Sequence, residues 1–201
     1  MFNLIRRDII LQKRQLLIFI PFIFVFVIMS VSPALTFMVA SIFIPFNAFG
    51  YDEKAETNIL LNSLPYTRTE IIASRYLGAV LYMILSIGLT ILALFVFNKP
   101  FGLTDILIGS GLFLLFAALT FPLYYIFKPG YITTIVLISF ILLTWISRSI
   151  VIFMEKHLTE VIHFLSSLSM STLYMVATVS IIVIYLISWG ISTLIYQRKV
   201  F

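Results

Sequence analysis

The chain has 201 residues, of which 62% are hydrophobic and 10% carry a charge, and its mean hydropathy is +1.14. A soluble domain carries about 25% charged residues, so this chain could not cover a globular surface in water, and soluble classes are excluded. It contains no cysteine, which excludes disulfides, thiolate metal sites and a cysteine nucleophile. The net charge of +5 is the one feature that would favour nucleic-acid binding, and we expect no nucleic-acid partner.

The first fifteen residues, MFNLIRRDIILQKRQ, predict a helix that lies on the membrane surface. On a helical wheel of about 100° per residue, the basic side chains fall on one half and most apolar side chains on the other. This pattern suits an anionic inner leaflet, and it also fits a plain positive flank of the first membrane span. The apolar stretch after Arg14 is too long for a signal peptide. The basic residues of the segment are Arg6, Arg7, Lys13 and Arg14.

Long runs without a charged residue predict an all-α protein that crosses the membrane several times. About 20 apolar residues cross the hydrocarbon core as a helix, and a run from Gln15 to Tyr51 is too long for one crossing. Pro33 lies near the middle of that run and predicts a tight turn between two spans. The six predicted spans are about 16–32, 34–50, 77–97, 106–127, 131–152 and 173–196.

The distribution of Lys and Arg predicts the orientation of these spans. If the N-terminus is inside, the outer side holds Lys99, Arg148 and Lys156 out of the 13 Lys and Arg residues. Both termini are therefore expected in the cytoplasm of a plasma-membrane protein, and residues 51–76 form the largest cytoplasmic loop. The inner residues are Arg6, Arg7, Lys13, Arg14, Lys54, Arg68, Arg75, Lys128, Arg198 and Lys199.

The loop over 51–76 carries a pattern of two short helices. Acidic residues at 52, 53 and 56 are expected in the first turns of one helix, an apolar patch follows, and Pro65 stops it. Thr67 and Glu70 then have the spacing of a capping box, so a second helix begins there and continues into the third span. The charges and the apolar patch predict a docking surface for a cytoplasmic partner. Packing against the protein's own inner mouth is the alternative.

The stretch LLNSLPYTRTEIIASRYL, after a basic N-terminal helix and a tight hairpin, resembles the ABC-2-type transporter permeases. It is most similar to the small Gram-positive permeases that export drugs, bacteriocins and amphipathic peptides such as phenol-soluble modulins. The resemblance implies a type V exporter-like fold, with the N-terminal interface helix and the whole chain, 1–201, as one transmembrane domain. It also implies that the loop acts as a coupling helix in a groove of a separate ATPase. The matching positions are Asp52, Glu53, Lys54, Glu56 and Asn58, backed by Ile59, Leu60, Leu61 and Leu64.

The same resemblance implies short re-entrant helices on the outer side, over residues 149–172. Arg148 lies at the outer end of the fifth span, where it can extend to the headgroups or contact lipid or substrate. His157 and His163 do not share a helix face, and no nearby carboxylate completes a metal site. No catalytic, metal or cofactor site is therefore expected on this chain.

The energy for transport must come from another polypeptide. The chain has no Walker A motif, since none of its eight glycines is followed by lysine. ATP and Mg²⁺ are therefore expected on a separate ATPase subunit, and this chain is not expected to be an enzyme. Six spans enclose too little for a pathway, so a second permease, identical or sister, is also expected.

The sequence thus favours a permease subunit of an ATP-driven exporter for hydrophobic or amphipathic cargo, such as a membrane-active peptide or a lipophilic drug. An ion-coupled secondary transporter is one alternative, but it would need ionisable groups near the membrane midplane. A lipid-modifying enzyme would need carboxylates or histidines clustered at the membrane edge. A non-transporting assembly subunit remains open as a further alternative. Co-purification of a P-loop ATPase separates these alternatives.

Overall fold

The computed structural model describes residues 19–54, 67–127 and 168–198, together with isolated helical positions between 134 and 153. Of residues 44 and 47–54 it describes the helical backbone alone. The predicted interface helix over 1–15 and most of the fifth span and the re-entrant segment lie outside the described residues. Every regular element within the described ranges is a helix, in agreement with the all-α prediction.

Four long helices make up the described part: α2 (Pro33–Lys54), α4 (Arg68–Val96), α5 (Leu103–Ile126) and α8 (Met170–Arg198). The last three are long and apolar enough to cross a membrane, and each overlaps one of the predicted spans (77–97, 106–127 and 173–196). Two shorter apolar helical stretches lie N-terminal to these three helices. One is Phe19–Ile28, and the other, Pro33–Phe43, is the first part of α2. The first of these helices ends at Ile28 and α2 begins at Pro33, so a short turn lies between them, as the proline predicts.

One boundary differs from the expectation. Asp52, Glu53 and Lys54 do not open a new loop helix but continue α2 from Pro33. Gly50 costs a helix about 1 kcal/mol, which is too little to end it where an apolar environment makes every backbone hydrogen bond obligatory. The described helix therefore reaches four residues beyond the predicted span.

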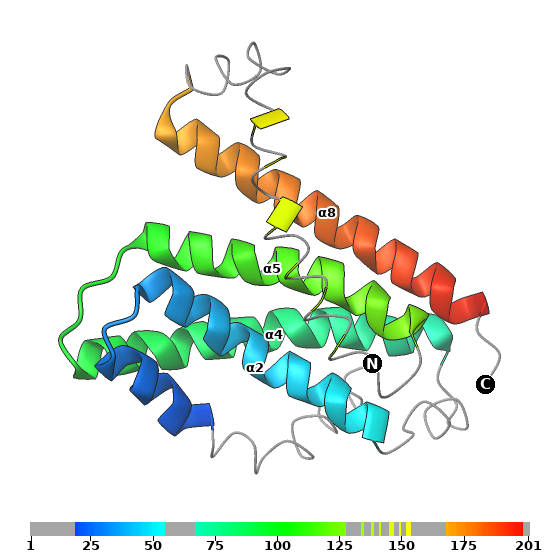
Figure 1. The fold of residues 1–201 in the computed structure, drawn as a ribbon, viewed down its shortest axis with the longest axis horizontal. Coiled ribbons are helices and arrows are strands. Elements are labelled where there is room, and N and C mark those ends of the chain that lie inside the picture. The colour runs from blue at the N-terminus through cyan, green and yellow to red at the C-terminus, as the bar shows by residue number, and fades with distance from the viewer. Residues whose placement is uncertain are drawn as a thin grey trace.

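The described helices form a bundle with two distinct ends (Figure 1). At one end, the turn between Ile28 and Pro33 lies beside the α4–α5 turn, and Lys99 Nζ donates to Ser30 Oγ at 2.8 Å. We call this the turn end. The C-terminal end of α2, the start of α4 and the C-terminal end of α8 lie at the opposite end, which we call the loop end (Figure 1).

Two apolar clusters hold the helices together. The first joins α4, α5 and α8 around the fully buried Tyr76 and Tyr196. The second joins the Phe19–Ile28 helix and α2 to the turn-end half of α4, with Phe19 and Phe37 fully buried. α5 packs against both α2 and α8, and α8 leans across α5 toward the start of α4 (Figure 1).

Gly109 allows α2 and α5 to pack unusually closely. A Cβ atom at this position would lie 2.6 Å from Phe37 Cβ and 2.7 Å from the backbone oxygen of Ala34. A Cβ at Gly111 would lie 3.1 Å from Ile181 Cδ1 on α8. Small residues bring helix backbones together in membranes, where van der Waals contact drives association. The two glycines therefore place α5 between α2 and α8.

Hydroxyl side chains inside the bundle are satisfied largely by their own helices. Ser41 Oγ donates to Phe37 O at 2.8 Å, and Thr90 Oγ1 donates to Ser86 O at 2.8 Å. Thr120 bonds to the backbone oxygen of Phe116 in the same way. Because each hydroxyl uses a carbonyl four residues earlier, these polar residues can be buried at membrane depth without a partner helix.

Candidate functional site

The predicted coupling residues are located at the loop end as far as the structure describes them. Asp52, Glu53 and Lys54 occupy the last turn of α2, and only their backbone is described. Thr67 and Glu70 lie at the start of α4. The remaining predicted residues, together with Arg148, lie outside the described residues: Glu56, Asn58, Ile59, Leu60, Leu61 and Leu64.

A capping box defines where the loop returns to the bundle. The Thr67 N–H donates to Glu70 Oε2 at 2.9 Å, and the Glu70 N–H donates to Thr67 Oγ1 at 3.3 Å. The Thr67 hydroxyl also donates to Glu70 Oε2 at 2.9 Å. These bonds satisfy two N–H groups that the first turn of a helix leaves unpaired. The last described residue of the loop is thus joined rigidly to α4.

Arg68, the next residue, binds the C-terminal end of α8. Its Nη1 donates to the backbone oxygen of Gln197 at 2.7 Å and to that of Tyr196 at 3.4 Å. The last carbonyls of a helix lack intrahelical donors and carry the negative end of the helix dipole. A guanidinium supplies both the missing N–H donors and a positive charge, so this contact fastens the start of α4 to the end of α8. The sequence alone predicts Arg68 only as a positive charge on the inner side of the membrane.

Two turns further along α4, the buried Tyr76 hydroxyl lies between two serines of α8. The oxygen–oxygen distances are 2.8 Å to Ser188 Oγ and 2.7 Å to Ser192 Oγ. Ser188 Oγ also donates to the backbone oxygen of Ala118 on α5, at 2.6 Å. A carbonyl cannot donate, so the Ser188 hydroxyl proton is used in the bond to Ala118 O. Ser188 Oγ must therefore accept from the Tyr76 hydroxyl. Tyr76 in turn accepts from Ser192, which gives one ordered chain of three hydrogen bonds.

Aromatic rings enclose this hydrogen-bonded chain. The Tyr76 ring stacks on Trp189 with centroids 5.7 Å apart and planes 10° apart. It meets Phe121 and Tyr185 edge to face at 5.0 and 5.1 Å. The Tyr185 hydroxyl donates to the backbone oxygen of Tyr76 at 2.9 Å. We call Tyr76 with Ser188, Ser192, Tyr185 and Trp189 the Tyr76 cluster.

The spacing of polar residues on α8 is a sequence signal for this cluster that the predictions above do not use. On α8, the buried residues are Tyr185, Ser188, Ser192 and Tyr196, spaced three or four apart. This spacing marks a single helix face, and polar residues on one face of an apolar helix predict contact with another helix. The partner Tyr76 could not be found in the same way, because tyrosines are frequent in this chain and their positions carry no pairing information.

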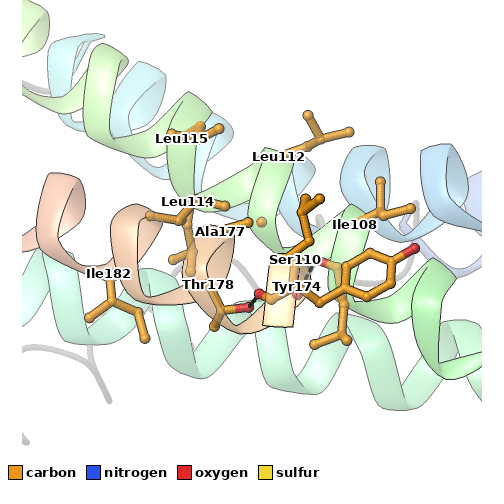
Figure 2. A pocket seen from close by; sticks show the side chains of 13 residues that line it. Ile108, Ser110, Leu112, Leu114, Leu115, Tyr174, Ala177, Thr178 and Ile182 are labelled. Carbon is orange, nitrogen blue, oxygen red and sulfur yellow. Dashed lines mark hydrogen bonds between the residues drawn. The ribbon is translucent and has the colours of Figure 1, made fainter. Parts of the chain in front are cut away.

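A cavity of about 310 Å³ lies between α5 and α8 (Figure 2). Its lining comes mainly from the turn-end halves of these two helices, on that side of the Tyr76 cluster. Leucine and isoleucine side chains make up most of its lining, with Ser110, Tyr174 and Thr178 among them. The hydroxyl of Ser110 donates to Leu107 O at 3.1 Å, and that of Thr178 donates to Tyr174 O at 2.8 Å. Since both hydroxyls are used within their own helices, the cavity presents a mainly apolar surface.

The described residues contain no group of three or more His, Asp or Glu side chains that could hold a metal ion. The contacts at the loop end connect helices to one another. The arrangement joins the end of a charged loop to three helices through directional bonds, and each of the four hydroxyls of the Tyr76 cluster takes part in them.

Comparison with known proteins gives one positive result. A family described as ABC-2 family transporter protein matches residues 3–197. No curated protein and no solved structure shows significant similarity to the chain.

Proposed function

Because the chain belongs to the ABC-2 family of transporter proteins, we propose that this multi-pass membrane permease is one subunit of an ATP-driven exporter. The match over residues 3–197 is the observation that carries the proposal. The sequence lacks a Walker A motif, so a separate ATPase subunit binds ATP and Mg²⁺, and this chain is not an enzyme and holds no cofactor. The resemblance to the small Gram-positive permeases supports the same assignment.

The proposed topology has six spans in the cell membrane, with the loop end and both termini in the cytoplasm. Among the described residues, Lys54, Arg68, Arg75 and Arg198 lie in the loop-end half, and Lys99 lies at the turn end. Cytoplasmic segments carry the excess of Lys and Arg in membrane proteins, which supports this orientation.

Labelling single cysteines tests the orientation directly, since the chain has no native cysteine. Phe101→Cys places a thiol at the turn end, and Gln197→Cys places one at the loop end. A membrane-impermeant maleimide added to intact cells should label position 101 and spare position 197. The reverse pattern would show that the loop end faces outward, and the ATPase could then not reach it.

In the proposed mechanism, the ATPase engages the coupling segment and pulls on it when its nucleotide sites close. α2 carries the first part of this segment to the loop end, and the capping box attaches its far side to α4. A force on the segment would thus enter the bundle through two helices. The proposed contact residues are Asp52, Glu53, Lys54, Glu56, Asn58, Ile59, Leu60, Leu61 and Leu64.

The complete exporter contains a second permease, identical or sister, because six spans enclose too little for a pathway. The proposed cargo is hydrophobic or amphipathic, such as a membrane-active peptide or a lipophilic drug. The near absence of charge within the predicted spans supports this class, and so does the apolar lining of the α5–α8 cavity. Arg148 is a proposed contact for lipid or substrate.

Co-purification and charge reversal test the function. The permease should carry a P-loop ATPase through purification and raise its turnover in liposomes. Glu53→Lys combined with Glu56→Lys should remove that stimulation by placing repulsive charges in the docking surface. Glu155→Lys with Glu160→Lys makes the same charge change on the predicted outer side and should leave stimulation intact. Unchanged stimulation in the first pair refutes the coupling assignment, and proton-driven flux without any ATPase supports a secondary transporter.

A further inference from the structure

The first nine residues of α4, from Arg68 to Tyr76, are bonded to α8 at both of their ends. Arg68 holds the backbone oxygens of Gln197 and Tyr196. Tyr76 holds the hydroxyls of Ser188 and Ser192, about 12 Å further along the helix axis at 1.5 Å per residue. Two fastening points at this separation resist both rotation and sliding of one helix against the other.

These bonds differ in kind from the apolar cluster that joins α2 to the turn-end half of α4. α2 meets the turn-end half of α4 through an apolar cluster that includes Phe37, Ala40 and Leu94. Apolar burial has no direction, and packed helices can shift by small sliding motions at modest cost. Hydrogen bonds depend on geometry. The buried bonds of Tyr76 are strengthened by the low dielectric of the interior, whereas the exposed bond from Arg68 to Gln197 is strengthened by the charge of the guanidinium. A displacement of α4 at Thr67 is therefore passed directly to α8 through these bonds.

We propose that Arg68 and Tyr76 fasten the start of α4 to the C-terminal half of α8, so that a pull on the loop ending at Thr67 moves α8 as well. This inference rests on the proposed function, because the pull comes from the partner ATPase. Arg68 is a positioning residue that acts through α8. We call the four hydrogen bonds of Arg68 and Tyr76 to α8 the α4–α8 clasp.

The clasp also determines where the bundle opens. Ser188 links α8 to α5 through the backbone oxygen of Ala118, and the apolar cavity lies on the turn-end side of that bond. When the loop end of α8 moves with α4, α8 pivots against α5 about this contact. The width of the cavity then changes, and motion at the loop end reaches the opposite half of the membrane.

Two pairs of spin labels test the two parts of the proposal. Leu77→Cys with Leu194→Cys reports the α4–α8 separation beside the clasp, at side chains 43% and 57% exposed. Leu112→Cys with Met175→Cys reports the α5–α8 separation across the cavity, at side chains 39% and 67% exposed. Pulsed EPR is recorded on the reconstituted complex with its ATPase, first without nucleotide and then trapped with ATP and vanadate. The first distance should stay constant and the second should shift.

Arg68→Gln removes the charged bond to α8 and should lower the ratio of fastened to open helix pairs by about tenfold. The first EPR distance then broadens and becomes nucleotide-dependent, and ATPase stimulation falls. The amount of bound ATPase stays constant, since the coupling segment is unchanged. Arg68→Lys, which still offers a cation to the α8 carbonyls, should restore most of both signals. Arg198→Gln removes a cation from the same helix end and is the matched control.

Tyr76→Phe provides a second route if Arg68→Gln does not assemble. It keeps the ring stacked on Trp189, removes the hydroxyl and should broaden the first distance in the same way. A first distance that changes on nucleotide trapping in the unmodified clasp overturns the inference. Wild-type distances and stimulation in Arg68→Gln also overturn it. If no ATPase binds even the wild type, the proposed function fails, while the first distance in the permease alone still tests the clasp.

Discussion

Gly109 is the position where the structure makes its sharpest prediction about stability. Gly109→Ala would place a Cβ 2.6 Å from Phe37 Cβ, 2.7 Å from Ala34 O and 3.3 Å from Met38 N. Carbon atoms pack best at about 3.5–4.0 Å, so α2 would have to move away by roughly 1 Å. Two of the three atoms belong to the α2 backbone, and the third is a Cβ that no rotamer change displaces. The strain therefore cannot be relieved by side-chain motion.

The expected cost follows from a matched comparison. Overpacking a close contact costs about 1–3 kcal/mol, whereas replacing glycine by alanine inside a helix gains up to about 1 kcal/mol. Gly88 lies inside α4, and a Cβ there would meet no heavy atom within 4 Å. Gly88→Ala should therefore gain the helix propensity of alanine without introducing a steric clash. Because both glycines lie within long apolar helices, the difference between the two variants isolates the clash at about 1–3 kcal/mol.

Unfolding titrations in mixed detergent micelles measure this difference, with Gly190→Ala in α8 as a second uncrowded control. Gly109→Ala should unfold at the lower denaturant fraction. Phe37→Ala should not rescue it, since the crowded atom is the Cβ that alanine keeps. If Gly109→Ala proves as stable as Gly88→Ala, α2 and α5 are further apart than the structure places them, and the reasoning fails.

Three further predictions concern the hydrogen bonds at the two ends. Thr67→Ala should cost about 1 kcal/mol and speed amide exchange in the first turn of α4, with Thr104→Ala on α5 as the control. Ser188→Ala loses two bonds of the ordered chain and should cost about 1–3 kcal/mol, against about 1 kcal/mol for Ser192→Ala. Equal costs in unfolding titrations would show that the bond from Ser188 to Ala118 O adds nothing to stability. Lys99→Ala removes a single exposed bond at the turn end and should change stability by less than about 0.5 kcal/mol. A larger loss would mean that the two turns depend on each other.

The start of α4 at the loop end and the turn before α2 at the turn end could both be anticipated from short-range patterns. The spacing of Thr67 and Glu70 predicts a helix start, and α4 begins at Arg68 with both bonds of the capping box in place. Pro33 predicts a turn, and α2 begins there. Caps and turns depend on residues within four positions of one another, so their signals survive in the bare sequence. The continuation of α2 through Lys54 could not be predicted from the sequence, because no local residue pattern marks a helix that continues past a predicted span end.

The role of Arg68 and the Tyr76 cluster depends on partners more than one hundred positions away. Arg68 meets Gln197, and Tyr76 meets Ser188 and Ser192, across separations of 112 to 129 residues. A charge near the end of a span looks the same whether it faces headgroups or the carbonyls of another helix. Only the packing of α8 against α4 distinguishes these two cases.

The amino-acid sequence by itself determined that this protein is a helical membrane protein, where the turn before Pro33 and the start of α4 lie, and which family pattern it carries. Those properties follow from composition and from neighbours along the chain, since every apolar span must satisfy its backbone internally. The tertiary structure alone decided which helices meet, how closely Gly109 lets α2 approach α5, and which polar groups become fasteners. Interhelical contacts join residues that are distant in the chain, and such pairings exist only once the helices have packed.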